Sequence, residues 1–223
     1  EALADLDQAL ALDPRLARAL IHRGTLHSYW GEWLTSRGGE PEGEYRAAVA
    51  DLMQALALDP GDYLSWLERG IGHLHWASWL QSRGRDSDEH YAAAIADFRK
   101  AVEIYPQFDE GWRRVGIALG DWAFAREARG EDVGDLYLDA ETAQDRALAI
   151  NARSCDSWLA HGDLHFNWGL YEHRRGRDPH VADAGRVRIR RVGVLWRAGA
   201  VPRVLRPRRT GRATASRSRR VAA

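Results

Sequence analysis

The sequence predicts an all-α solenoid of stacked antiparallel helix hairpins, followed by an irregular or disordered arginine-rich C-terminal tail. Two observations predict this fold. Equivalent residues recur every 46 positions along the 223-residue chain, and each period holds two helical stretches. A fixed period of this size is typical of repeat proteins, whose units bury apolar faces against their neighbours.

Four ladders of residues carry the period. One is a glycine, one a tryptophan, one an Arg-Gly pair, and one a pair that mostly ends in proline. Their members are Gly24, Gly70, Gly116 and Gly162; Trp30, Trp76, Trp122 and Trp168; Arg37-Gly38, Arg83-Gly84, Arg129-Gly130 and Arg175-Gly176; and Asp13-Pro14, Asp59-Pro60, Tyr105-Pro106 and Asn151-Ala152.

The second copy shows how each period becomes a helix pair. Spacings of three and four place one set of side chains of the segment 63–83 on one helical face. Glycine at the Arg83-Gly84 pair ends this helix. We expect Asp88 to cap a second helix from about Glu89 to Ile104, which Pro106 ends. The residues of the shared face are Trp66, Gly70, His73, Ala77 and Leu80.

Small residues seven apart mark the packing seam, because seven residues are two helical turns. A glycine inside a helix costs about 1 kcal/mol relative to alanine, so a repeated one needs a reason. Close helix contact is the simplest reason. The pairs are Gly24 and Gly31, Gly70 and Ala77, Gly116 and Ala123, and Gly162 and Gly169 on the first helices, and Ala48 and Ala55, Ala94 and Ala101, and Ala140 and Ala147 on the second.

These residues resemble the tetratricopeptide repeat. The second copy shows Trp66 and Gly70 on the first helix, then Ala94, Phe98 and Ala101, then Pro106. The family's unit is about 34 residues, so about 12 residues are inserted here. Two positions depart from the pattern. His73 stands where an aromatic residue is usual, and Gln144 replaces a packing residue held elsewhere by Leu6, Leu52 and Phe98.

The segments 37–41 and 175–179 also resemble long repeats attached to bacterial serine/threonine kinases. This resemblance implies an alternative function, the regulatory part of a larger kinase with its catalytic domain before Glu1. The chain itself has no Gly-rich nucleotide loop, His-Arg-Asp or Asp-Phe-Gly motif. It opens in the middle of a repeat, so we expect residues to precede Glu1.

Charge divides the chain into a predicted repeat domain, residues 1–182, and a tail, residues 183–223. Residues 1–183 hold all 32 acidic residues and 19 of the 32 basic ones, a formal charge of −13. Residues 184–223 hold the other 13 basic residues and no acidic one, a formal charge of +13.

The period fails where the tail begins. Tyr45, Tyr91 and Tyr137 predict a tyrosine at 183, but Asp183 stands there. The tail is then a basic arm for nucleic acid or an acidic partner, a disordered linker, or the product of a frameshift. The abrupt stop in mid-unit favours the frameshift. An arginine-rich segment would bind nucleic acid non-specifically through counterion release in any case.

The broken period leaves the helix from about Cys155 to Arg175 without a regular partner. We expect its face of Trp158, Leu164 and Trp168 to be uncovered, with possible self-association through this uncapped end. Residues 192–196 are a candidate cover for it.

No cofactor or metal site is expected. His161 and His165 are four apart with Asp163 between them, but zinc needs three or four ligands, so packing is the favoured interpretation. His73 and His75 are a weaker pair. The tryptophans at repeated positions read as packing residues; Trp33 and Trp79, in the inserted part, are expected to extend the core rather than form an aromatic lip.

No nucleophile, base and acid stand in a catalytic arrangement, so the chain is not expected to be an enzyme. The lone Cys155 excludes an intramolecular disulfide and fits a reducing, cytoplasmic compartment. No apolar run approaches the length that spans a membrane, so no membrane partner is expected.

The resemblance implies a function: a non-catalytic scaffold that binds a protein partner's peptide or helix in a concave groove lined by the first helices. Arg113 and Arg114 would orient an acidic segment, and Leu64, Leu67 and Ile71 would bury apolar side chains. A lysine/asparagine carboxylate clamp is absent, because Ile21, Thr25, Leu67 and Ile71 hold its positions. The candidate groove residues are Ile21, His22, Thr25, Tyr29, Leu64, Leu67, Glu68, Ile71, His75, Arg113, Arg114, Ile117 and Asp121.

Overall fold

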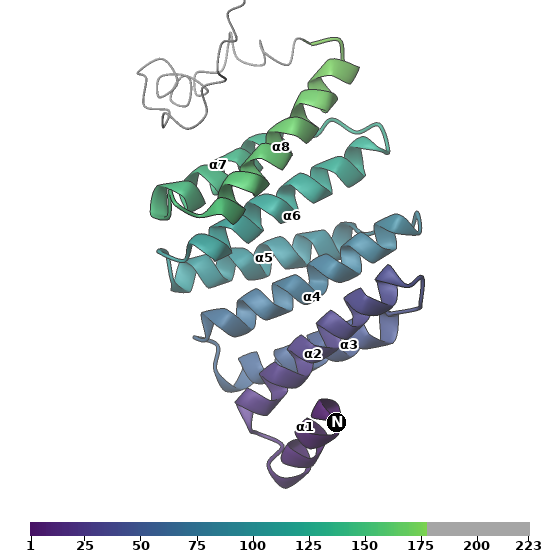
Figure 1. Cartoon of the computed structure of the whole chain (residues 1–223), viewed down its shortest axis with the longest axis vertical. Coiled ribbons are helices and arrows are strands. Elements are labelled where there is room, and N and C mark those ends of the chain that lie inside the picture. The colour runs from purple at the N-terminus through teal and green to yellow at the C-terminus, as the bar shows by residue number, and fades with distance from the viewer. Residues whose placement is uncertain (178–223) are drawn as a thin grey trace, which may run out of the picture. The chain divides into compact units, whose positions relative to one another are not determined.

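A computed structural model describes residues 1–177, which form eight α-helices and no strand (Figure 1). The predicted all-α solenoid is therefore confirmed for this part of the chain. The predicted tail, and with it the candidate cover at 192–196, lies outside the described residues. The helices are α1 (Ala2–Leu12), α2 (Ala17–Ser36), α3 (Glu42–Leu58), α4 (Tyr63–Ser82), α5 (Asp88–Ile104), α6 (Asp109–Glu127), α7 (Gly134–Ile150) and α8 (Cys155–Arg174).

The ladders end the helices as predicted. Gly38, Gly84, Gly130 and Gly176 all have positive φ, between 65° and 82°, just after the four longer helices. Glycine reaches this left-handed conformation without a steric penalty. The shorter helices α1, α3, α5 and α7 each end one residue before a member of the turn ladder.

The predicted cap at Asp88 is wrong. The N-cap of α5 is Ser87, with no side-chain cap hydrogen bond, and Asp88 is the first helical residue. Its carboxylate instead accepts hydrogen bonds from Trp122 Nε1 at 2.8 Å and from Arg129 Nη2 at 2.8 and 2.9 Å. Asp88 therefore ties α5 to α6 and to the turn that follows α6.

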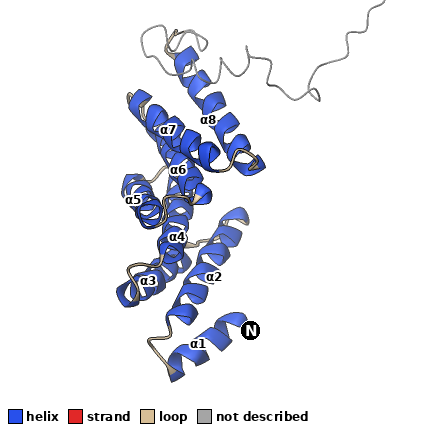
Figure 2. Ribbon diagram, turned by 90° about the vertical axis from the view of Figure 1, so that its left-hand side faces the viewer, coloured by secondary structure: helices blue, strands red, loops and turns tan. Residues whose placement is uncertain are grey.

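The helices form three complete pairs, α2/α3, α4/α5 and α6/α7, between a leading α1 and a trailing α8. Figure 2 shows α2, α4, α6 and α8 following one another, with α3, α5 and α7 beside them. Successive first helices contact each other, whereas α3, α5 and α7 have no contact among themselves in residues 1–177. Because the first helices lie closer together, their row forms the inner side of the curve.

The glycine seam is a set of close helix contacts in the first three copies, as predicted, but not in the fourth. A Cβ built on Gly24, Gly70 or Gly116 would lie 2.6 to 2.8 Å from a side-chain atom of Leu52, Phe98 or Gln144, respectively. Real Cβ atoms do not approach so closely, so these positions require glycine. At Gly162 a Cβ would meet nothing within 4 Å among the described residues.

The tryptophans at one repeated position fasten the turns. The indole nitrogens of Trp66, Trp112 and Trp158 donate to the backbone carbonyls of residues 60, 106 and 152, at 2.9, 3.0 and 3.0 Å. The same bond in three copies confirms a structural role. Trp79 is 2% exposed and extends the core as expected, but Trp33 is 43% exposed and stacks on Trp30, so that expectation was wrong for Trp33.

A repeated ion pair joins the two helices of the first two complete pairs. Arg23 binds Asp51 through two hydrogen bonds of 2.7 Å, and Arg69 binds Asp97 through bonds of 2.8 and 2.6 Å. In the third pair, apolar residues hold the equivalent positions: Val115 and Ala143, which are 2% and 3% exposed. One buried ionic contact is thus exchanged for an apolar one within a single chain.

Within residues 1–177, the exposed face of α8 includes Trp158, as predicted, but not Leu164 and Trp168. Leu164 and Trp168 are buried, 5% and 8% exposed, and belong to the core shared with α6 and α7. They were expected to be uncovered because their second helix is missing, but the preceding pair covers them. The exposed apolar side chains are Trp158, Leu159, Phe166 and Leu170, at 50%, 65%, 67% and 40%.

Candidate functional site

The predicted groove residues fall on α2, α4 and α6, and most of them are at least partly accessible. His22, Tyr29 and Leu64 are exposed. The half-buried set is Ile21, Thr25, Glu68, His75, Arg113, Arg114, Ile117 and Asp121. The inner side of the curve therefore offers a mixed surface, with apolar side chains and charges of both signs.

Leu67 and Ile71 are not part of this accessible surface. They are 4% and 3% exposed and belong to the core that also contains Val115 and Leu119 of α6. Periodicity placed them on the first helix, but the neighbouring first helix covers them. Neither side chain is available to a ligand, so only Leu64 of the three leucine and isoleucine candidates on α4 remains.

Polar contacts link several groove residues across neighbouring helices. Thr25 Oγ1 donates a 3.2 Å hydrogen bond to Glu68 Oε2, which joins α2 to α4. Burial raises the pKa of Glu68, and the Thr25 hydroxyl opposes the rise. The rings of Tyr29 and His75 meet edge to face, with 6.2 Å between centroids. Burial lowers the pKa of His75, which favours its neutral form.

The two groove arginines already share an acidic partner. Glu110 Oε1 accepts from Arg113 Nη2 at 3.2 Å and from Arg114 Nη2 at 3.3 Å. All three residues lie within one and a half turns of α6. Part of the positive charge expected to orient an acidic partner is therefore matched within the chain.

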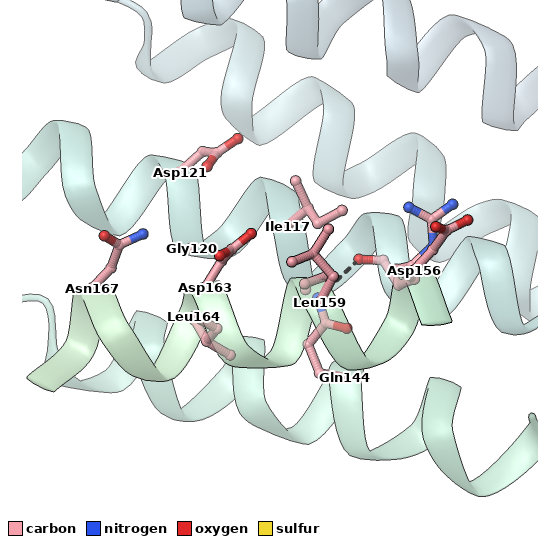
Figure 3. A pocket seen from close by; sticks show the side chains of 12 residues that line it. Ile117, Gly120, Asp121, Gln144, Asp156, Leu159, Asp163, Leu164 and Asn167 are labelled. Carbon is pink, nitrogen blue, oxygen red and sulfur yellow. Dashed lines mark hydrogen bonds between the residues drawn. The ribbon is translucent and has the colours of Figure 1, made fainter. Parts of the chain in front are cut away.

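A cleft of about 260 Å³ lies between α6 and α8 on the inner side (Figure 3). Asp121 of α6 and Asp163 and Asn167 of α8 lie at one end, and Asp156 lies at the other. Ile117 and Leu159 lie between the two ends. The repeat register also places Leu159 and Asp163 on the concave side with Ile117 and Asp121, but it does not predict a cleft between α6 and α8.

Gly120 distinguishes this wall from the equivalent wall of the preceding repeat. Leu74 of α4 is 5% exposed and packs in the core beside α6. The equivalent residue of α6, 46 positions later, is Gly120, which lines the cleft. A Cβ on Gly120 would lie 3.2 Å from Leu164 Cδ1. Leu164 corresponds to Ala118, 46 positions earlier, so the larger side chain comes from α4 in one contact and from α8 in the next.

Asp121 is an unusual carboxylate. Its side chain keeps partial exposure at the cleft, yet protein atoms surround it so closely that burial raises its pKa to about 6. Solvent reaches the Asp121 carboxylate through the mouth of the cleft, and protein atoms surround its other sides. No arginine, lysine or histidine of residues 1–177 forms an ion pair with Asp121.

Gln144 of α7 forms part of the cleft wall. This is the residue that departs from the packing position held elsewhere by Leu52 and Phe98. Its side chain is 0% exposed, and its Nε2 donates a 3.3 Å hydrogen bond to the Arg113 carbonyl. Its Oε1 is buried and has no partner in the described part of the chain. The wall therefore holds an unsatisfied acceptor, which is costly in a folded protein.

The histidines pack against one another rather than around a metal position. His161 and His165 lie 3.3 Å apart through their Nε2 atoms, and His73 and His90 lie 3.1 Å apart through Nδ1. Burial lowers the pKa of His73 to about 4. In residues 1–177 no three His, Cys, Asp or Glu side chains converge as metal ligands would.

Within residues 1–177, no helix combines the length and apolarity that a bilayer crossing requires.

Solved structures with a similar arrangement of helices are distant in sequence. The first TPR domain of human RPAP3 is 14% identical, with a TM-score of 0.45 over 68% of this chain and 97% of that one. The Sgt2 TPR domain from Aspergillus fumigatus is 17% identical, with a TM-score of 0.43 over 74% and 90%. The first TPR of Spaghetti (RPAP3), bound to the HSP90 peptide SRMEEVD, is 14% identical, with a TM-score of 0.42 over 66% and 94%.

These likenesses are too distant to carry a ligand across to this chain. No curated protein matches its sequence. A family match covers residues 86–108, which span α5 and the turn after it. This segment holds Ala94, Phe98, Ala101 and Pro106, the residues that pointed to a known repeat. The matching family model is the tetratricopeptide repeat, and the match includes α5 but not α4.

Proposed function

We propose that this chain is a non-catalytic scaffold that binds a peptide or helix of a partner protein on the inner side of its curve, along α2, α4, α6 and α8. The observation that carries the proposal is the cleft between α6 and α8, which opens onto the row of first helices. Stacked helices hold this surface in place, so little conformational entropy is lost on binding.

The surface has the chemistry of a protein-binding site rather than a catalytic one. Exposed Tyr29 and Leu64 provide apolar contact area, and half-buried charges beside them provide orientation. Aromatic and apolar anchors ringed by polar groups are typical of protein interfaces. The kinase alternative concerns residues before Glu1, and the nucleic-acid alternative concerns residues outside the described part; both stay predictions.

Selection of binders from a random peptide library on the full chain, followed by hydrogen-exchange mapping, tests the proposal. We expect protection by bound peptide along the first helices. Tyr29→Ala and Leu64→Ala should each weaken binding about tenfold, the loss of about 1.4 kcal/mol expected for an anchor residue. Met53→Ala on α3, where Met53 is 55% exposed, is the matched control and should change binding by less than twofold.

Protection on α3, α5 and α7 instead of the first helices would contradict the proposed binding face. Equal effects of Met53→Ala and Leu64→Ala would also contradict it, because both changes shorten an exposed apolar side chain and only Leu64 lies on that face.

A further inference from the structure

We propose that the cleft between α6 and α8 receives a cationic side chain, that of an arginine, from the segment bound along the first helices. The inference rests on the proposed scaffold function and names the chemistry of its partner. It departs from the acidic partner expected from Arg113 and Arg114, because the structure shows where the unmatched charge lies.

The charge lining the cleft is mostly negative and unmatched. Asp121, Asp156 and Asp163 line it, and no arginine, lysine or histidine of residues 1–177 forms an ion pair with any of them. Arg113 is the cation among the described lining residues, and its guanidinium already donates to Glu110. A cation that enters the cleft would therefore meet carboxylates without displacing an existing partner.

Two polar groups in the walls of the cleft lack a partner within residues 1–177. Gln144 is fully buried, and its Oε1 has no hydrogen-bond donor. Asp121 bears the cost of burial, which raises its pKa to about 6, and no positive charge of residues 1–177 offsets this cost. A positively charged hydrogen-bond donor in the cleft would relieve the condition of Asp121, because a nearby opposite charge favours the ionised carboxyl. Gln144 Oε1 is closed to solvent and would be reached only if the wall moved.

The size and walls of the cleft suit one side chain. Its volume of about 260 Å³ lies below the roughly 300–1,000 Å³ of typical small-molecule sites. Ile117 and Leu159 lie between its acidic ends, where the methylene stem of an arginine could pack. A guanidinium is more weakly hydrated than an ammonium and presents several donors in a plane, so it suits a narrow site with carboxylates on two helices.

Nuclear magnetic resonance titration of the full chain tests the proposal with four small probes at constant ionic strength. The probes are the N-acetyl amides of arginine, citrulline, norleucine and glutamate. Citrulline is the matched neutral probe, because it keeps the shape of arginine and lacks its charge. We expect only the arginine probe to shift the amides of Gly116, Gly120 and Asp163, with a dissociation constant on the order of 1 mM.

Three variants make the assignment specific. Asp121→Asn should weaken the arginine probe about tenfold by removing one charge. Gly120→Leu restores the residue that the repeat places at Leu74 and should abolish binding by filling the cleft. Asp5→Asn removes the same charge from an exposed position of α1, which contacts no helix of residues 1–177 except α2, and should leave the affinity within twofold. The spectra themselves report whether each variant is folded.

Equal binding of citrulline and arginine, or shifts by the glutamate probe alone, would overturn the inference. The proposed scaffold function would survive that result if library peptides still protect the first helices. Conversely, arginine binding that Gly120→Leu leaves intact would place the cation outside this cleft and also overturn the inference.

Discussion

Replacing Asp121 by asparagine should stabilise the fold at neutral pH. Burial raises the pKa of this carboxyl from its ordinary 3.8 to about 6, and no cation of the described chain compensates. Each pKa unit corresponds to about 1.4 kcal/mol, so the difference of roughly two units sets an upper bound of about 3 kcal/mol. Because the side chain keeps partial exposure at the cleft, we expect about 1–2 kcal/mol.

The pH dependence of the effect is its diagnostic. The folded state holds the Asp121 proton up to about pH 6, whereas the unfolded state releases it near pH 4. The folded state therefore binds more protons between these values, and this group lowers the stability of the native protein as pH rises through that window. Below about pH 4 both states are protonated and the group contributes nothing.

Urea unfolding of the native protein and the variant, followed by circular dichroism from pH 3.5 to pH 8, measures this difference. We expect the stability gained by Asp121→Asn to be near zero at pH 3.5, to grow between about pH 4 and 6, and to stay level above. Asp5→Asn, at an exposed residue, should show no such rise. A gain that is independent of pH, or a loss of stability at pH 7.5, would refute the reasoning that Asp121 is a desolvated, unpaired carboxylate.

Two more predictions test the repeat by comparing equivalent residues. Gly70→Ala should destabilise the fold by about 1–3 kcal/mol, because its Cβ would lie 2.6 Å from the buried Phe98 ring. Gly162→Ala, where a Cβ meets no atom of the described residues within 4 Å, should stabilise it by up to about 1 kcal/mol. Equal effects of the two changes in urea unfolding would contradict the close helix contact at Gly70. Asp97→Ala should cost about 3–5 kcal/mol of stability, because it leaves Arg69 without its ion-pair partner, and adding Arg69→Val should recover most of that loss. Additive effects of the two changes in a double-mutant cycle would contradict this prediction.

Much of the fold could be predicted because the repeat supplies several copies of each position. A single glycine inside a helix is ambiguous, but its recurrence opposite Leu52, Phe98 and Gln144 identifies a close contact. The helix ends could also be predicted, because glycine readily takes the positive φ that is found at all four Arg-Gly pairs.

What the sequence did not disclose is how neighbouring hairpins cover one another. Leu67 and Ile71 lie on the first helix, and periodicity alone cannot separate a side chain facing the groove from one facing the next helix. Leu164 and Trp168 were likewise expected to be uncovered, although the α6/α7 pair buries them. Asp88 shows a related limit: an aspartate at a helix start is a sound cap candidate until an indole and a guanidinium from the next unit compete for it.

The third helix pair departs from the others in ways that belong together. Its position equivalent to Leu74 is Gly120, the position equivalent to Phe98 is Gln144, and the residue following Gly120 is Asp121. The first change lets Leu164 approach α6, the second places an amide on the wall, and the third places a carboxylate beside the opening. The second and third would weaken a repeat that served only as a spacer, because each buries a polar group. Their meeting at one cleft is better explained by a ligand than by independent drift at two positions.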